Sequence, residues 1–195
     1  MATSDKATNG FFSFLDKVTE YFLRHKNKMT EVSINEQMKL SEHFSLGELV
    51  KTKHVTTDGN IPSHVAIENL KRICENWLED LRYSYNTLYC LEPGEDYDSS
   101  KNVEPIIINS GYRSPTVNQL AGGAANSNHL TGCAVDIRCA GKEQMIRYAA
   151  ILLDIADGTK QDYDELLLEQ HGNVCWLHFA VRPKDNRRKI LFIAK

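Results

Sequence analysis

Three runs with the patterns of β-strands lie close together near the end of the sequence. Apolar side chains either alternate with polar ones or follow one another in these runs, as in half-buried or fully buried strands. The runs are YDELLLEQ at 163–170, VCWLHFAV at 174–181 and RKILFIAK at 188–195. Helical patterns come earlier. A long helix is predicted to begin at Pro62-Ser63, with Ser63 as its N-cap, and another covers 142–153. Helices that come early and strands that come mostly late favour an α+β fold with a central antiparallel sheet.

The long helix beginning at Pro62-Ser63 carries apolar side chains at three- and four-residue steps, which predicts one buried face. The predicted stripe consists of Ile67, Leu70, Ile73, Cys74, Trp77, Leu81 and Leu88.

The chain divides into a short N-terminal region and a compact domain. Its 195 residues are enough for one domain with a substantial core and an appended segment. Apolar residues at helical spacing predict an amphipathic helix over about 11–25, and the polar stretch 27–39 is interpreted as a linker. We therefore expect residues 1–39 to form a helix and linker, and 40–195 to form the domain. The helix could dock a protein partner or pack back onto the domain.

Charge and hydropathy exclude several classes of protein. A net charge of −3 gives no overall basic field, so nucleic acid is not expected as a partner. The basic run Arg187-Arg188-Lys189 is interpreted as a solvated turn before the last strand. No run of about 18 apolar residues is present, so no membrane span is expected. The N-terminus lacks the pattern of a standard secretory signal, so synthesis in the cytoplasm is predicted.

The five cysteines are an odd number and none lies in a Cys-x-x-Cys pair, which argues against a disulfide framework. We expect them to be mainly reduced residues of the core: Cys74, Cys90, Cys133, Cys139 and Cys175.

Three polar elements carry the functional signal. His129 precedes Asp136 by seven positions, a spacing that suits one ligand on a loop and another on the following strand. Alternation in 174–181 places Trp176 and His178 on one face of a strand. Arg113 lies on a turn after a buried strand. Taken singly, His129 is interpreted as a surface loop residue, His178 as a hydrogen-bonded core histidine and Arg113 as a structural ion-pair partner.

Together, Ser127-x-His129-x-x-Gly132-x-x-x-Asp136 and the later Trp176-x-His178 resemble the zinc D-alanyl-D-alanine metallopeptidases. That family includes zinc carboxypeptidases and phage endolysins that cut the peptides of bacterial cell walls. The resemblance extends over roughly 40–182 and implies an α+β fold with a cleft across an antiparallel sheet. It also implies one Zn²⁺ bound by His129, Asp136 and His178. Two imidazoles and one carboxylate leave a fourth tetrahedral position open, as catalytic zinc requires.

The resemblance also implies the roles of other residues. Arg113, in a turn that matches the family, would pair with a peptide carboxylate. Ser127 would hydrogen-bond within the loop or to the substrate. Members usually carry an acidic general base three positions before the second histidine, where this sequence has Cys175. Glu169 also matches a family position and is the nearest alternative carboxylate in the sequence, so Glu169 and Cys175 are the predicted catalytic positions. Glu165 and His171 are further candidates.

The predicted function is hydrolysis of peptide bonds in peptidoglycan, as a D-Ala-D-Ala carboxypeptidase or an endopeptidase of the endolysin type. The absence of a standard signal pattern leads us to expect a phage or prophage protein that reaches the wall with the help of a holin or virion. One alternative is a catalytically weak, zinc-containing module that binds the wall or builds a virion. A plain structural domain in which the motifs occur by coincidence is a second alternative.

Overall fold

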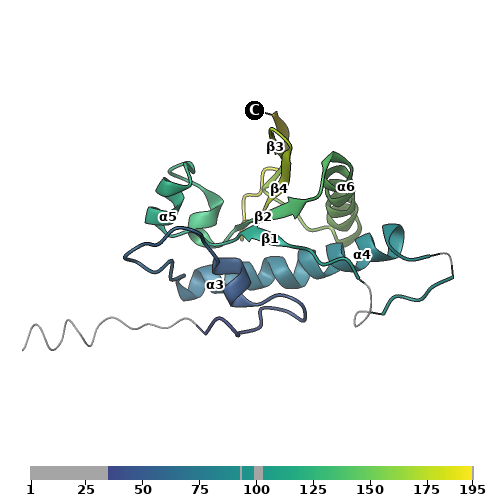
Figure 1. The fold of residues 1–195 in the computed structure, drawn as a ribbon, viewed down its shortest axis with the longest axis horizontal. Coiled ribbons are helices and arrows are strands. Elements are labelled where there is room, and N and C mark those ends of the chain that lie inside the picture. The colour runs from purple at the N-terminus through teal and green to yellow at the C-terminus, as the bar shows by residue number, and fades with distance from the viewer. Residues whose placement is uncertain (1–34, 93, 99–102, 195) are drawn as a thin grey trace, which may run out of the picture. The chain divides into compact units, whose positions relative to one another are not determined.

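The computed structural model describes residues 35–92, 94–98 and 103–194 (Figure 1). The helix predicted over about 11–25, and most of the linker after it, lie outside the described residues. The helices are α2 (Leu46–Val50), α3 (His64–Ile73), α4 (Glu79–Tyr89), α5 (Pro115–Leu120) and α6 (Lys142–Thr159), with a π-helical turn η1 (Cys74–Leu78) and a 3₁₀ turn η2 (Asn128–Thr131). The strands are β1 (Ile108–Ser110), β2 (Ala134–Cys139), β3 (Glu165–His171), β4 (Val174–Ala180) and β5 (Lys189–Ala194).

The five strands form one sheet in the order β1-β2-β4-β3-β5. Neighbouring strands are antiparallel except β3 and β5, which are parallel. The predicted α+β fold with a central antiparallel sheet is therefore confirmed, apart from the one parallel pair of β3 and β5. After β4 the chain passes the start of β3 before it pairs with β3 as β5. There the amides of Arg188 and Lys189 donate to the carbonyls of Tyr163 and Asp164, just before β3 begins.

The long predicted helix forms as α3, η1 and α4, and the Ser63 side chain accepts a hydrogen bond from the Ala66 amide at its start. Most of the predicted stripe is buried: Leu70, Ile73, Cys74, Trp77 and Leu81. Ile67 is only half-buried and Leu88 is 63% exposed. Leu88 differs from the prediction because the described residues leave the last turn of α4 largely exposed.

The two faces of the sheet have different roles. Val135, Leu177 and Phe179 belong to the core face, where the rings of Phe179 and Trp77 pack edge to face with centroids 5.0 Å apart. Helix α6 also packs against β2, β3 and β4, and it runs to Thr159, six residues beyond the predicted end. Along each strand every second side chain points to the opposite face of the sheet, and side chains on that face line the functional cavity described below.

All five cysteines are free thiols within the described part of the chain. Four are buried as predicted, whereas Cys90 is exposed because it follows the uncovered last turn of α4. No described helix has the length and apolar content that a membrane crossing requires.

Candidate metal centre

The imidazole of His129 is fixed by the loop that carries it. Ser127 caps the 3₁₀ turn η2 and accepts a hydrogen bond from the His129 amide, 3.3 Å away. The Nδ1 atom of His129 lies 2.6 Å from the Gly111 carbonyl, which fixes that nitrogen as the donor. His129 is 2% exposed, and its Nε2 atom has no hydrogen-bond partner among the described residues. A buried acceptor nitrogen is thus held ready for a ligand.

Gly132 allows the chain to pass from η2 into β2. Its φ of +70° lies in the left-handed region, and a Cβ atom there would meet the Ala66 carbonyl oxygen at 2.3 Å. The close approach places Gly132 against α3. This turn sets the spacing between His129 and Asp136.

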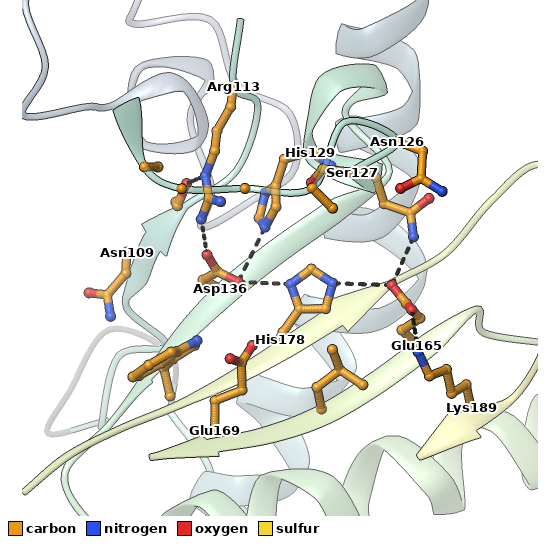
Figure 2. Close-up of a pocket in the computed structure, with 18 of the residues that line it drawn as sticks. Asn109, Arg113, Asn126, Ser127, His129, Asp136, Glu165, Glu169, His178 and Lys189 are labelled. Carbon is orange, nitrogen blue, oxygen red and sulfur yellow. Dashed lines mark hydrogen bonds and ion pairs between the residues drawn. The ribbon is translucent and has the colours of Figure 1, made fainter. Parts of the chain in front are cut away.

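Asp136 and His178 are brought together by strand pairing. They are direct partners in the antiparallel ladder between β2 and β4. The Nδ1 atom of His178 lies 2.9 Å from Asp136 Oδ1, and Nε2 of His129 lies 3.3 Å from the same oxygen. Figure 2 shows both imidazoles converging on this carboxylate.

Arg113 holds the other oxygen of the same carboxylate. Its Nη2 group donates to Asp136 Oδ2, and its Nε group donates to Ser110 Oγ at 2.8 Å. The sequence left open whether Arg113 is an ion-pair partner or a substrate ligand. In the structure it is an ion-pair partner and also lines the cavity.

The turn that carries Arg113 is held by Asn60, which the sequence did not single out. Asn60 is 3% exposed and has a φ of +52°. Its Nδ2 group donates to the carbonyls of Val50, at 2.7 Å, and Tyr112, at 3.3 Å, and its Oδ1 atom accepts from the Ser114 amide at 2.7 Å. Asn60 therefore fixes the backbone on both sides of Arg113. Asparagine tolerates a left-handed backbone, but this long-range pairing has no sequence signal.

Charge in the cluster favours a bound cation. Burial raises the pKa of Asp136, but the neighbouring His129 and His178 outweigh burial and hold that pKa well below its usual range. Burial lowers the pKa of His178, whereas its contacts with Asp136 and Glu165 raise it, with a net result of about 9. The carboxylates therefore stabilise positive charge at the imidazoles, which either a proton or a metal ion can supply.

The donor set fits a metal ion. One ligand atom each from His129, Asp136 and His178 lie within 4.8 Å of one another, and all three residues are buried. A second indication is Nε2 of His129, which makes no hydrogen bond to the described residues and lies 3.3 Å from Asp136 Oδ1, a contact that a shared cation would satisfy. Two imidazoles and a carboxylate are a common ligand set of catalytic zinc.

A cavity of about 840 Å³ opens over the cluster. Glu169 lines it, and Figure 2 shows this carboxylate on the same side of the sheet as His178. Ser127 lines it as well, although its side chain already serves as the cap of η2. Two predicted candidates are absent from the lining. His171 lies at the exposed end of β3, and Cys175 faces the core.

Cys175 is not placed to act in this cavity, in contrast to the sequence-based expectation. It lies three positions before His178 on β4, and an odd separation along a strand puts two side chains on opposite faces. Cys175 is 4% exposed and pairs across the ladder with Cys139 on the core side.

Two residues of the basic run, Arg187 and Lys189, belong to the site, whereas Arg188 between them does not line the cavity. Arg187 and Lys189 line the cavity, and both contact Glu165. Arg187 also pairs with Asp164, which is fully buried. The sequence carried one usable signal: alternation in 163–170 places Glu165 and Glu169 on the same face of one strand.

An α+β domain with a buried His–Asp–His cluster beneath an open cavity has the architecture of a mononuclear metallohydrolase. A family model described as Peptidase M15 matches residues 42–161, more than half of the chain. The chain therefore belongs to the M15 peptidases, the zinc D-Ala-D-Ala metallopeptidase family, and it is a metallopeptidase by family. No curated protein matches the chain. The family match includes His129 and Asp136 and ends before β3 and β4, which carry Glu169 and His178.

Proposed function

We propose that this chain is a zinc-dependent peptidase that hydrolyses a peptide bond in bacterial peptidoglycan, as a D-Ala-D-Ala carboxypeptidase or an endopeptidase. The observation that carries the proposal is the buried cluster of His129, Asp136 and His178 under the cavity, in which Nε2 of His129 makes no hydrogen bond to the described residues and faces Asp136 Oδ1 at 3.3 Å. Zinc held there would act as a Lewis acid on the scissile carbonyl and lower the pKa of a coordinated water.

Glu169 is the proposed general base. It lies on β3 opposite Trp176, two positions from the residue that faces His178, and all these side chains share the cavity side of the sheet. A carboxylate there can accept a proton from the attacking water and deliver it to the leaving amine.

Glu165 is less suited to that task, although it also lines the cavity. Its contacts with His178 and Arg187 outweigh burial and lower its pKa to about 2. A carboxylate with such a low pKa accepts protons poorly near neutral pH.

Arg113 is proposed to contact the substrate as well as Asp136. A guanidinium has five N–H groups, and the bonds to Ser110 and Asp136 use two of them. Since Arg113 lines the cavity, its remaining donors suit a carboxylate or carbonyl of a peptide. Ser127, which also lines the cavity, is proposed as a further substrate contact.

The proposal is tested by release of new amines from purified peptidoglycan. Zinc-loaded wild type should release them, and Glu169→Gln should lose about 10²–10⁴-fold in rate while it keeps zinc. A wild type that binds zinc and wall fragments without releasing amines would support the catalytically weak wall-binding module instead. Action on the wall in a phage or prophage setting stays a prediction.

A further inference from the structure

We propose that Glu165 is a positioning residue that holds the imidazole of His178 in the orientation a metal ligand needs. The inference rests on the proposed function in one respect, namely that His178 binds zinc. It assigns to Glu165 no direct contact with zinc or substrate.

The two nitrogens of the His178 ring face two different carboxylates. Nδ1 lies 2.9 Å from Asp136 Oδ1, on the side where the ligand atoms converge. Nε2 lies 3.7 Å from Glu165 Oε2, within the range of an ion pair. Metal-binding histidines usually donate their second ring N–H to a carboxylate or carbonyl, which fixes tautomer and ring orientation. Glu165 is the carboxylate that faces this nitrogen of His178, at ion-pair distance, whereas Gly111 holds His129 through a hydrogen bond of 2.6 Å.

Strand register explains why Glu165 can reach the ring. Leu167 is the direct partner of His178 on the neighbouring strand, and Glu165 lies two positions before it on the same face. A side chain diagonal to its neighbour is within reach when both are long. Figure 2 shows Glu165 and Asp136 on opposite sides of the His178 ring.

Glu165 is itself held in place from three directions. Its Oε1 atom lies 2.9 Å from Arg187 Nη2 and 3.3 Å from Lys189 Nζ. Its Oε2 atom accepts a hydrogen bond of 3.2 Å from Asn128, the residue before His129. The side chain is only 15% exposed. The two basic residues thus neutralise the carboxylate and turn its second oxygen toward His178.

This arrangement links the segment at the start of β5 to the metal centre. Arg188 offers a matched control in that segment, because its guanidinium pairs with Asp157 and Asp162 instead of Glu165. Removal of an outer carboxylate from a metal-bound histidine typically lowers metal affinity by about 10–100-fold.

The test measures zinc dissociation constants, by competition with a chromophoric chelator, for wild type, Glu165→Ala, Glu165→Gln and Arg188→Gln. Glu165→Ala should bind zinc about 10–100-fold more weakly. Glu165→Gln keeps an oxygen that can accept from Nε2–H, so its loss of affinity should be smaller than that of Glu165→Ala. Arg188→Gln should bind like wild type. Thermal unfolding of the metal-free proteins, run alongside, separates affinity from folding.

Wild-type affinity in Glu165→Ala would overturn the inference and leave the proposed function standing. Equal losses in Glu165→Ala and Arg188→Gln would also overturn it, because a general effect of the segment would then explain both. If Glu165→Ala does not fold, Glu165→Gln decides: weaker binding than Arg188→Gln supports the inference, and equal binding overturns it. A folded wild type without zinc affinity would instead overturn the proposed function.

Discussion

Arg113 and Asp136 form an ion pair in which the guanidinium bonds one carboxylate oxygen and leaves the other to the histidines. Oδ2 accepts from Arg113, while Oδ1 lies 2.9 Å from His178 and 3.3 Å from His129. The arginine therefore sets which oxygen of Asp136 is presented to a metal ion.

Replacing Arg113 by lysine should weaken zinc binding. Lysine keeps the charge but cannot bond Ser110 and Asp136 with one planar group. We expect the zinc dissociation constant of Arg113→Lys to rise at least about tenfold, with little change in the unfolding midpoint. An unchanged zinc affinity combined with a raised KM would show that Arg113 acts on the substrate alone.

Placing the family's acidic residue at Cys175 should damage the fold rather than restore a base. Because Cys175 faces the core, Cys175→Asp would bury an unpaired charge, at a cost of about 3–5 kcal/mol in the free energy of unfolding. Denaturant unfolding measures this cost. Val174→Asp is the matched control, since Val174 is 62% exposed on the same strand. A stable Cys175→Asp protein with a higher peptidase rate would contradict the placement.

Asn60→Ala should lower stability by about 2–3 kcal/mol, because it leaves the buried Ser114 amide and Val50 carbonyl without the bonds they make to Asn60. Denaturant unfolding again gives the value. Asp185→Ala tests whether the backbone alone matters, since Asp185 shares the left-handed conformation but is exposed. Losses of equal size in both variants would show that the side-chain bonds of Asn60 contribute little.

Acid should destabilise the domain through Asp164. Burial raises the pKa of this carboxyl, but bonds from Arg187 and Asn128 outweigh burial and lower it from its usual 3.8 to about 2. A carboxyl with a lowered folded-state pKa adds stability above its unfolded pKa and loses it as pH falls through the folded pKa. The stability difference between wild type and Asp164→Asn should therefore be constant above about pH 5 and shrink as the pH falls toward 2. A difference that is flat throughout this range would rule out the linkage.

Local sequence patterns predicted much of the fold. Ser63 caps the long helix, and the 3.6-residue repeat of Leu70, Ile73 and Trp77 marks its buried face. The parallel pairing of β5 with β3 was not predictable from such patterns, because it depends on the path that the chain takes between β4 and β5. The periodicity of a strand indicates which of its side chains share a face, but it does not indicate which strand lies beside it.

The candidate site, like the fold, could be predicted only in part. His129, Asp136 and His178 were predicted from the family resemblance, and the structure brings them together. The contacts that orient them depend on residues far apart in sequence: Asn60 with Ser114, and Arg187 with Glu165. Cys175 shows that the family resemblance can also mislead. A position that matches a catalytic residue of the family can face the core when strand alternation places it there.

The most direct test of the account is the zinc content of the folded protein. Pure wild type should contain about one equivalent of zinc, because one set of three buried ligands fits one tetrahedral ion. His178→Ala should lose most of it, while Trp176→Phe, on the same strand and face but outside the ligand set, should retain it. A folded wild type that takes up no zinc, or a His178→Ala protein that binds it as tightly as wild type, would contradict the proposed metal centre.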